Sequence, residues 1–96
     1  MFTPIDLKSV TIPNRIVMPA MCQYSATDDG NVTSWHGVHY GTRAVGGVGL
    51  IILEATAVEK RGRLSNNDLG IWDDRHIGGL RELVDIGHAH GSVMGI

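Results

Sequence analysis

Arg15-Ile-Val-Met-Pro-Ala-Met-Cys-Gln-Tyr-Ser25 is the stretch that decides the fold, because a short apolar strand runs directly into a turn carrying a thiol and a phenol. Such a strand end is typical of the mouth of an α/β barrel, where residues at the C-terminal ends of the strands form the active site. The candidate functional residues of this stretch are therefore those that follow Met18.

The segments around this stretch alternate between predicted strands and helices. Residues 2–12 alternate loosely between apolar and polar side chains, which predicts a β-hairpin with its turn at Lys8-Ser9. Residues 15–18 and 48–55 are almost continuously apolar, as in buried strands of a parallel sheet. Residues 92–96 begin a third such strand, and a polar loop covers residues 58–73.

Two helices are predicted between these strands. The first begins at Thr33 or Ser34 and ends at Gly46-Gly47. The second is capped by Asp73 or Asp74 and ends at Gly91. The helical spacing predicts one apolar face on each helix: Trp35, Val38, Thr42 and Val45 on the first, and Ile77, Leu80, Leu83, Val84 and Gly87 on the second.

The order of elements defines the fold class. A hairpin is followed by strand, helix, strand, helix and a partial strand, which fits right-handed βαβ units. This alternation is found in a (β/α)8 barrel and in a doubly wound sheet, and the periodicity alone leaves both open.

Composition excludes several classes of protein. The net charge of −2 gives no reason to expect nucleic acid or an anionic membrane as a partner. The longest apolar run, Val48 to Leu53, is far shorter than the ~18 residues of a membrane span. The single cysteine, Cys22, cannot form an internal disulfide, and no signal peptide is evident, so we expect a reducing, cytoplasmic environment.

Several polar residues have plain structural interpretations. His36 and His39 are three residues apart, but no further ligand stands at metal-binding spacing, so we expect packing and hydrogen bonding and no metal. Glu54 is interpreted as a paired structural carboxylate. His88 and His90 complement the dipole at the end of the second helix. Arg61 and Arg63 are assigned to a solvated or subunit-contacting loop, with attraction of a phosphate-bearing cofactor as the alternative.

A series of motifs resembles one family. In order they are Phe2-Thr-Pro-Ile, Pro13-Asn-Arg-Ile-Val-Met, Met21-Cys-Gln-Tyr-Ser, Trp35-His-Gly-Val-His-Tyr, Gly49-Leu-Ile-Ile-Leu-Glu-Ala-Thr-Ala-Val, Gly62-Arg and Asp68-Leu-Gly-Ile-Trp-Asp-Asp. Together they resemble the N-terminal part of the old yellow enzyme family, and most closely its thermophilic-like branch, whose first strand ends in a cysteine.

The resemblance implies a (β/α)8 barrel with FMN at the C-terminal ends of its strands. Such barrels need ~250 residues, so residues 1–96 are expected to be an incomplete N-terminal portion of one FMN-binding domain. That portion would contain the hairpin, two βα units and the start of strand 3. The parent would be a homodimer or homotetramer.

The resemblance also assigns site residues. Pro19, Ala20, Met21, Cys22 and Ala55 would contact the flavin, with the Cys22 thiol tuning its reduction potential. Tyr24 would bind the substrate. Read without the family, Cys22 is a small buried apolar residue and Tyr24 a loop tyrosine that covers the core.

The implied reaction passes a hydride from NADPH or NADH through FMN to the C=C bond of an α,β-unsaturated carbonyl compound. No residue before Ile96 is assigned as catalytic, so the 96 residues alone are expected to be inactive. The alternatives are a non-catalytic βαβ partner-binding module or decayed gene fragment, and another phosphate-binding barrel enzyme, against which Cys22 and Tyr24 argue.

Overall fold

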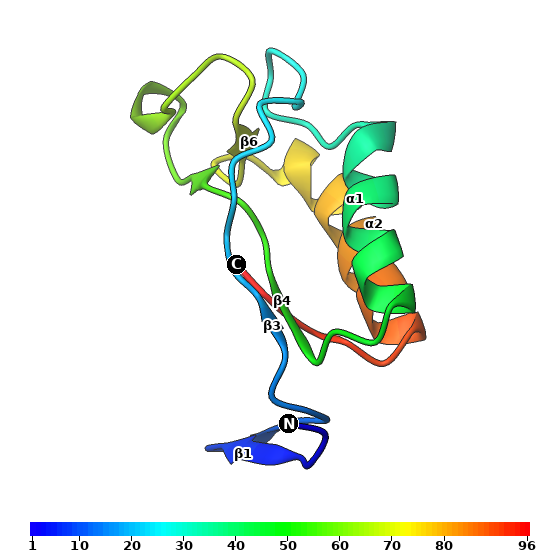
Figure 1. Cartoon of the computed structure of the whole chain (residues 1–96). Helices are drawn as coiled ribbons and strands as arrows, with labels where there is room; N and C mark the ends of the chain where they lie inside the picture. The colour runs from blue at the N-terminus through cyan, green and yellow to red at the C-terminus, as the bar shows by residue number, and fades with distance from the viewer.

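Three parallel strands form the central sheet, in the order in which they occur in the chain. They are β3 (Val17–Met18), β4 (Leu50–Ile52) and β7 (Val93–Gly95), described in a computed structural model that covers residues 1–96. Met18 pairs with Ile51, and Ile51 with Met94. Because the strands are parallel, their C-terminal ends lie at one edge of the sheet (Figure 1).

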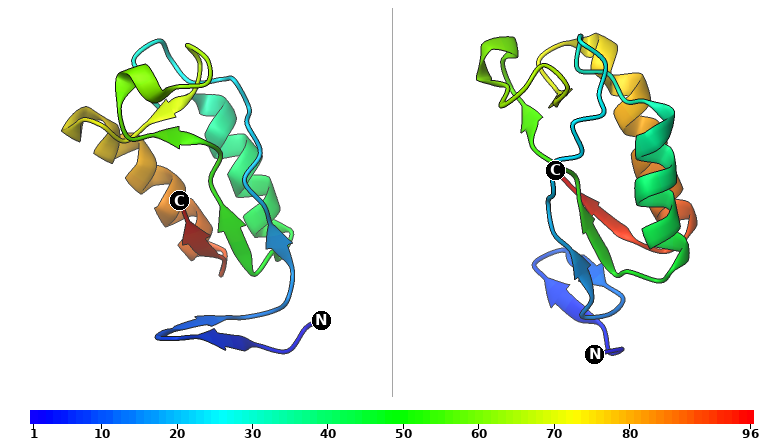
Figure 2. Two further views of the ribbon diagram at one scale, coloured as in Figure 1. Left: turned by 90° about the vertical axis from the view of Figure 1, so that its left-hand side faces the viewer. Right: turned by 45° about the horizontal axis from the view of Figure 1, so that its top comes forward.

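Both long helices cover the same face of this sheet. They are α1 (Ser34–Val45) and α2 (Ile77–Ala89), and the views of Figures 1 and 2 agree that they lie side by side. A doubly wound sheet carries helices on both faces. In a (β/α)8 barrel each strand pairs with the strand before it in the chain, and all helices cover the outer face of the sheet. The arrangement is therefore that of the first part of a barrel.

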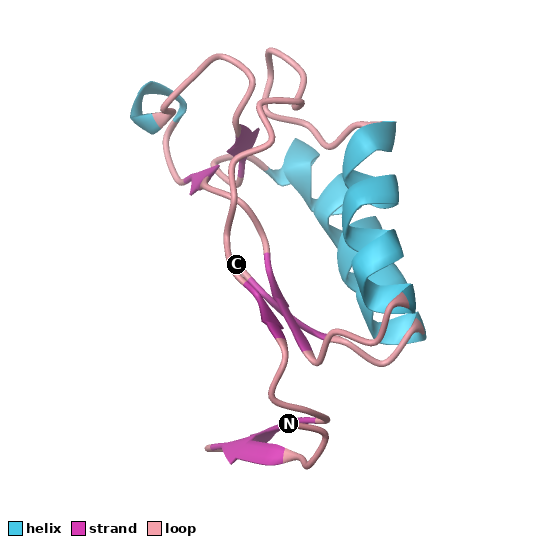
Figure 3. Ribbon diagram, in the orientation of Figure 1, coloured by secondary structure: helices cyan, strands magenta, loops and turns pink.

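The predicted hairpin is confirmed. It consists of β1 (Ile5–Leu7) and β2 (Val10–Ile12), which pair antiparallel around a turn in which Lys8 has a φ of 54°. It lies at the end of the molecule opposite the long loops (Figure 3). Arg15 joins it to β3, because its guanidinium donates to the carbonyls of Thr3 and Pro4. The hairpin thus lies beyond the N-terminal end of the sheet, attached to the segment that leads into β3.

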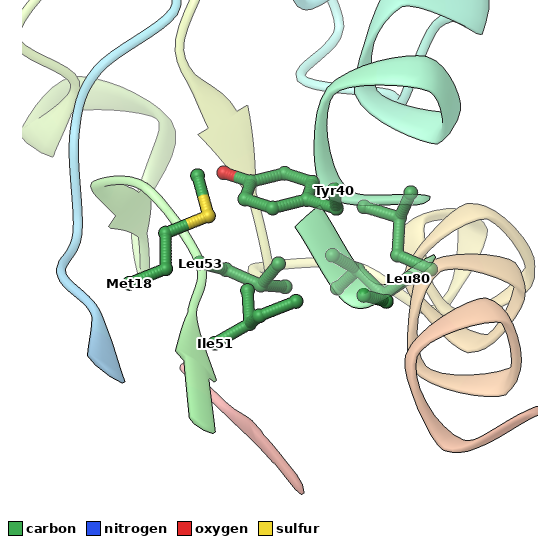
Figure 4. Close-up of a cluster of buried hydrophobic side chains, with 7 residues drawn as sticks. Met18, Tyr40, Ile51, Leu53 and Leu80 are labelled. Atoms are coloured by element: carbon green, nitrogen blue, oxygen red, sulfur yellow. The ribbon is translucent and has the colours of Figure 1, made fainter. Parts of the chain in front are cut away.

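The core lies between the sheet and the two helices. Figure 4 shows its buried side chains pointing toward one another; they are Met18, Tyr40, Ala44, Ile51, Leu53, Leu80 and Leu83. The strand predicted over residues 48–55 is a regular strand only over Leu50–Ile52. Its pairing with the chain beyond continues by one bond, because the Leu53 amide donates to the Gly95 carbonyl at 2.9 Å.

The predicted inner face of α1 is wrong, although the helix itself begins and ends as expected. Trp35, Val38 and Val45 are 45%, 57% and 67% exposed, and Thr42 is exposed too. The face that is buried carries His36, His39, Tyr40 and Ala44. Two of these polar side chains find a buried partner in Glu54, so hydrogen bonding rather than hydropathy selects the inner face.

Glycines allow α1 and α2 to pack closely. A Cβ on Gly41 would lie 3.3 Å from the Ile86 Cγ2 atom, and one on Gly37 would lie 4.0 Å from its Cδ1 atom. On α2 the predicted inner face is confirmed for Leu80, Leu83 and Gly87, whereas Ile77 is exposed. Neither helix has the length and hydropathy that crossing a bilayer requires.

The segment between β4 and α2 contains more structure than the predicted polar loop. Strands β5 (Thr56–Ala57) and β6 (Leu69–Gly70) pair in parallel, and short 3-10 helices occupy η1 (Lys60–Gly62) and η2 (Asp74–His76). The Asp73 side chain accepts from the Arg75 amide at 2.9 Å and caps η2, whereas α2 itself begins after His76 with no side-chain cap, so the predicted aspartate cap belongs to the short helix that leads into α2. The segment between β4 and α2 is therefore a structured region and not an irregular loop.

Candidate functional site

The residues that follow β3 and β4 meet at one edge of the sheet. The pairing of Met18 with Ile51 places Pro19–Cys22 beside the end of β4. Glu54 and Ala55 lie in the segment that directly follows β4. The structure thus brings the sequence-predicted residues of the two strands to the same edge.

The turn after β3 is open to solvent along its apolar side. Pro19, Ala20 and Met21 are exposed, and Cys22 is half-buried. Tyr24 has a φ of 52°, a left-handed conformation that costs a non-glycine residue of order 1 kcal/mol. A residue keeps such a backbone only when its surroundings fix it.

The Tyr24 ring projects outward and is 60% exposed. Cys22 lies close enough to influence it, because the charge that the thiol carries when ionised raises the pKa of the Tyr24 phenol. Like any tyrosine phenol it is protonated at neutral pH, and it can donate a hydrogen bond.

Side chains from the start of α1 fix this turn. The Trp35 indole donates to the Gln23 side-chain oxygen at 3.1 Å, and the Gln23 amide donates in turn to the Met21 carbonyl at 3.1 Å. The Thr33 hydroxyl, at the N-cap of α1, donates to the Ser25 carbonyl at 3.0 Å. The left-handed residue is thus bracketed by contacts on both sides.

A buried polar cluster lies beneath the end of β4. One Glu54 carboxylate oxygen accepts from the Tyr40 hydroxyl at 2.6 Å and the other contacts His36 Nε2 at 3.1 Å. The Glu54 amide donates to the same Tyr40 oxygen at 2.9 Å. The interpretation of Glu54 as a paired structural carboxylate is confirmed.

The tautomer of His36 follows from its other contact. Its Nδ1 accepts from the Thr33 amide at 3.0 Å, so the ring proton is on Nε2 and is donated to Glu54. Burial raises the pKa of Tyr40, and the adjacent Glu54 carboxylate raises it further. Each of the two Glu54 carboxylate oxygens therefore has its own hydrogen-bond donor.

His39 lies next to this cluster without joining it. Its ring stacks on Trp35 at 5.5 Å and meets the edge of Tyr40 at 4.9 Å, and both ring nitrogens lack a hydrogen-bond partner. Burial lowers the pKa of His39, and the Arg43 charge lowers it further. No group of three or more His, Cys, Asp or Glu side chains is placed to hold a metal ion.

The two loop arginines differ from one another. Arg61 is exposed and pairs with Glu59 at 2.6 Å, as expected of a solvated loop. Arg63 instead donates to the carbonyls of Asp28, Lys60 and Asn66, with its guanidinium 5.7 Å from the Trp72 ring. Arg63 is therefore a structural residue of the loop.

At the other end of the chain, His88 and His90 are exposed near the end of α2.

Sequence reasoning missed the contacts that unite these elements. His36 and Tyr40 are four residues apart on α1, and Glu54 is the charged residue that ends an apolar strand. That spacing, together with a carboxylate at a strand end, was the signal that could have identified the cluster.

Comparisons with known proteins identify one family. A sequence model of the NADH:flavin oxidoreductase / NADH oxidase family matches residues 1–96. The chain is 58% identical to an NADPH dehydrogenase of Geobacillus sp. (strain WCH70), covering 100% of this chain and 28% of that protein. It is 55% identical to an NADPH dehydrogenase of Geobacillus thermodenitrificans (strain NG80-2), with the same coverage. The chain thus spans 28% of the length of these curated relatives.

Solved structures show the same fold. Morphinone reductase superposes with a TM-score of 0.86 at 34% identity, over 97% of this chain and 24% of that chain. An old yellow enzyme from Pichia sp. AKU4542 superposes with a TM-score of 0.89 at 30% identity, over 97% and 24% of the two chains. The fold is therefore the N-terminal part of a (β/α)8 barrel, as predicted. With every residue matched by the family model, the chain belongs to the NADH:flavin oxidoreductase / NADH oxidase family, among whose structures are the old yellow enzymes.

Proposed function

We propose that these 96 residues form the first portion of a single FMN-binding barrel, and that the intact protein is an NAD(P)H-dependent reductase of activated C=C bonds. The names of the curated relatives, NADPH dehydrogenases, support the nicotinamide donor. A similar structure of morphinone reductase is a complex with tetrahydroNAD, which supports the same class of donor. The substrate proposed is a small enone or enal.

Two features of the strand ends fit a flavin. The isoalloxazine is flat and largely apolar, and Pro19, Ala20 and Met21 present exposed apolar atoms at the edge where Ala55 also lies. The rim of that ring carries hydrogen-bond acceptors. The backbone N–H groups of residues 20–25 and of Ala55 donate to no backbone carbonyl in the chain, so they are available as donors.

The proposed roles follow from this placement. Pro19, Ala20, Met21 and Ala55 would hold the ring, which when bound supplies hydride transfer. Cys22 would lie at its polar edge, where a polarisable sulfur influences the reduction potential. Tyr24 would donate a hydrogen bond to the substrate, for which its exposed and protonated phenol is suited.

The remaining proposals concern the intact protein. We expect a homodimer or homotetramer in a reducing, cytoplasmic environment, in keeping with the single half-buried thiol. No step of the reaction is assigned to an acid or base within residues 1–96.

The observation that carries the proposal is the convergence of Met21, Cys22 and Ala55 on one sheet edge in a chain matched throughout by the family. The test is to purify the intact protein that contains this chain, record its visible spectrum, and follow NADPH consumption with 2-cyclohexenone. We expect a bound flavin and stoichiometric formation of the saturated ketone. A colourless protein that retains no added FMN would contradict the proposal.

A further inference from the structure

The two walls of the proposed flavin site come from segments about thirty residues apart in the sequence, and beyond the paired strands β3 and β4 no hydrogen bond joins residues 19–25 directly to residues 53–57. Ala55 follows β4, whereas Met21–Ser25 follow β3. The structure contains a third element that touches both, the first two turns of α1. A flavin site needs its walls at a fixed separation, because displacement by a fraction of an ångström already affects binding and reactivity.

On the β4 side, the contact is made through Glu54, the residue before Ala55. Tyr40 binds both the backbone amide and the carboxylate of Glu54, at 2.9 and 2.6 Å. Such a double contact fixes the peptide as well as the side chain. His36 holds the second carboxylate oxygen. The end of β4 is therefore attached to α1 by three hydrogen bonds.

On the β3 side, the contacts are made through Thr33 and Trp35. Thr33 donates to the Ser25 carbonyl and Trp35 donates to Gln23, one residue on each side of the left-handed Tyr24. The two sides are continuous, because His36 Nδ1 accepts from the Thr33 amide while its Nε2 donates to Glu54.

The cluster is better suited to fixing geometry than to adding stability. His36, Tyr40 and Glu54 are 0%, 1% and 3% exposed. Buried ionic and polar groups often contribute no more stability than apolar side chains of similar volume, because their desolvation offsets the attraction between them. Their hydrogen bonds are directional, however, and allow only one arrangement of the groups.

We propose that His36, Tyr40 and Glu54 are positioning residues that set the distance between the Ala55 wall and the Met21–Ser25 turn. This inference rests on the proposed function for its consequence, which is tight and correctly oriented flavin binding. It also makes a claim about the turn itself that needs no flavin: the cluster determines how far Cys22 is protected.

Glu54→Gln in the intact protein is the sharpest variant. The new amide presents N–H groups where His36 Nε2 or the Tyr40 hydroxyl now donates, so one pair becomes donor against donor. If the amide nitrogen faces His36, the ring must reverse its proton and the Thr33 amide loses its acceptor. If it faces Tyr40, the hydroxyl must accept and its own proton loses its partner. The disturbance should reach the Cys22 turn through Thr33. Tyr40→Phe is the milder second variant, since it retains the ring and removes only the hydroxyl.

The matched control is Leu83→Ala, which opens the same hydrophobic core, to which Tyr40 also contributes, without removing a hydrogen bond of the cluster; Leu83 is 1% exposed. Three quantities are compared: the thermal midpoint, the dissociation constant for added FMN, and the alkylation rate of Cys22 in flavin-free protein, resolved by mass spectrometry. For an unsatisfied buried group we expect FMN binding weakened about tenfold and Cys22 alkylated about tenfold faster.

Leu83→Ala should lower the thermal midpoint without either of the other effects. If both cluster variants leave FMN binding and Cys22 alkylation at wild-type values, or change them only in proportion to the midpoint as Leu83→Ala does, the inference is overturned. A wild-type protein that binds no FMN would instead refute the proposed function, and the alkylation rates would still decide whether the cluster positions the turn.

Discussion

His39 is buried between Trp35 and Tyr40, and neither ring nitrogen has a hydrogen-bond partner. The groups facing it are Arg43, Glu54 and His36, and burial together with Arg43 lowers its pKa from 6.5. The folded chain therefore keeps the ring neutral at a pH where the unfolded chain takes up a proton. The contribution of neutral His39 to the free energy of unfolding is therefore complete above pH 6.5 and is lost as the pH falls below that value.

His39→Phe should reduce the fall in stability below pH 6.5, because phenylalanine keeps the aromatic packing and does not titrate. The measurement is the denaturation midpoint of the intact protein in urea from pH 8 down to pH 5, with His88→Gln, an exposed histidine on α2, as the control. Equal pH dependence in wild type and His39→Phe would rule out His39 as the source.

Gly49 shows how one missing side chain sets the start of a strand. A Cβ there would lie 2.6 Å from the Asn14 side-chain oxygen and 2.8 Å from the Asn14 carbonyl. Asn14 cannot move freely, because it also donates to the Gly47 carbonyl and accepts from the Ile16 amide. Gly49→Ala is expected to destabilise the intact protein by about 1–3 kcal/mol, as overpacking does.

Gly78→Ala is the matched control for that change, since nothing lies within 4 Å of its added Cβ on α2. It should leave stability unchanged or raise it by up to about 1 kcal/mol through helix propensity. Thermal unfolding of the two variants measures the difference. A Gly49→Ala protein as stable as wild type would mean that the chain accommodates the Cβ by shifting Asn14.

At the scale of elements, the loop before β6 depends on a buried carboxylate. Asp68 accepts from the Leu64 and Ser65 amides at 2.7 and 3.2 Å, and from the Ser65 hydroxyl at 2.8 Å. Asp68→Asn turns one acceptor into a donor, so the loop should open more often, with a loss of about 1–3 kcal/mol in local stability.

Trypsin reports this opening, because Arg61 and Arg63 lie in the same loop. Cleavage there should accelerate in Asp68→Asn and stay at the wild-type rate in Asp28→Asn, whose carboxylate is exposed and makes no hydrogen bond to hold the loop. Unchanged cleavage in Asp68→Asn would show that Arg63 and Trp72 alone fix the segment.

The elements themselves were largely predictable from the sequence, for local reasons. The Lys8-Ser9 turn, the start of α1 after Thr33 and the apolar strands each follow from a few neighbouring residues. The β5–β6 pair was not predictable, because it joins two-residue strands through long-range contacts. The inner face of α1 was predicted wrongly, since His36 and Tyr40 are buried only because Glu54 arrives from β4.

In the candidate site, too, some features could be predicted from the sequence and others depend on contacts between distant segments. Met21, Cys22, Tyr24 and Ala55 were predicted from resemblance to a family, and the structure places them in the segments that follow the paired strands β3 and β4. Their support by α1 depends on where three segments meet in space, which no single stretch of sequence specifies.

At the scale of the whole molecule, apolar surface remains uncovered beside the last strand. A groove of about 550 Å³ runs along α2 and β7, lined by residues that include Leu53, Ile77, Leu80, Val84, Met94 and Ile96. On the other flank, Trp35, Val38 and Val45 of α1 are exposed. Both outer strands of the sheet, β3 and β7, also have one unpaired edge. Open edges and apolar faces of this kind favour association.

The 96 residues on their own are therefore expected to associate or unfold, and to bind FMN weakly or not at all. The walls described here form one side of a flavin site, and a ligand held from one side loses most of the enclosure that binding requires. Fluorescence titration of FMN with the purified 96-residue chain, alongside analytical ultracentrifugation, measures both properties. The intact protein serves as the control and should quench the flavin stoichiometrically. A monomeric 96-residue chain that binds FMN stoichiometrically at micromolar concentration would show that β3, β4 and the α1 cluster suffice for the site, and that the rest of a barrel adds reactivity rather than binding.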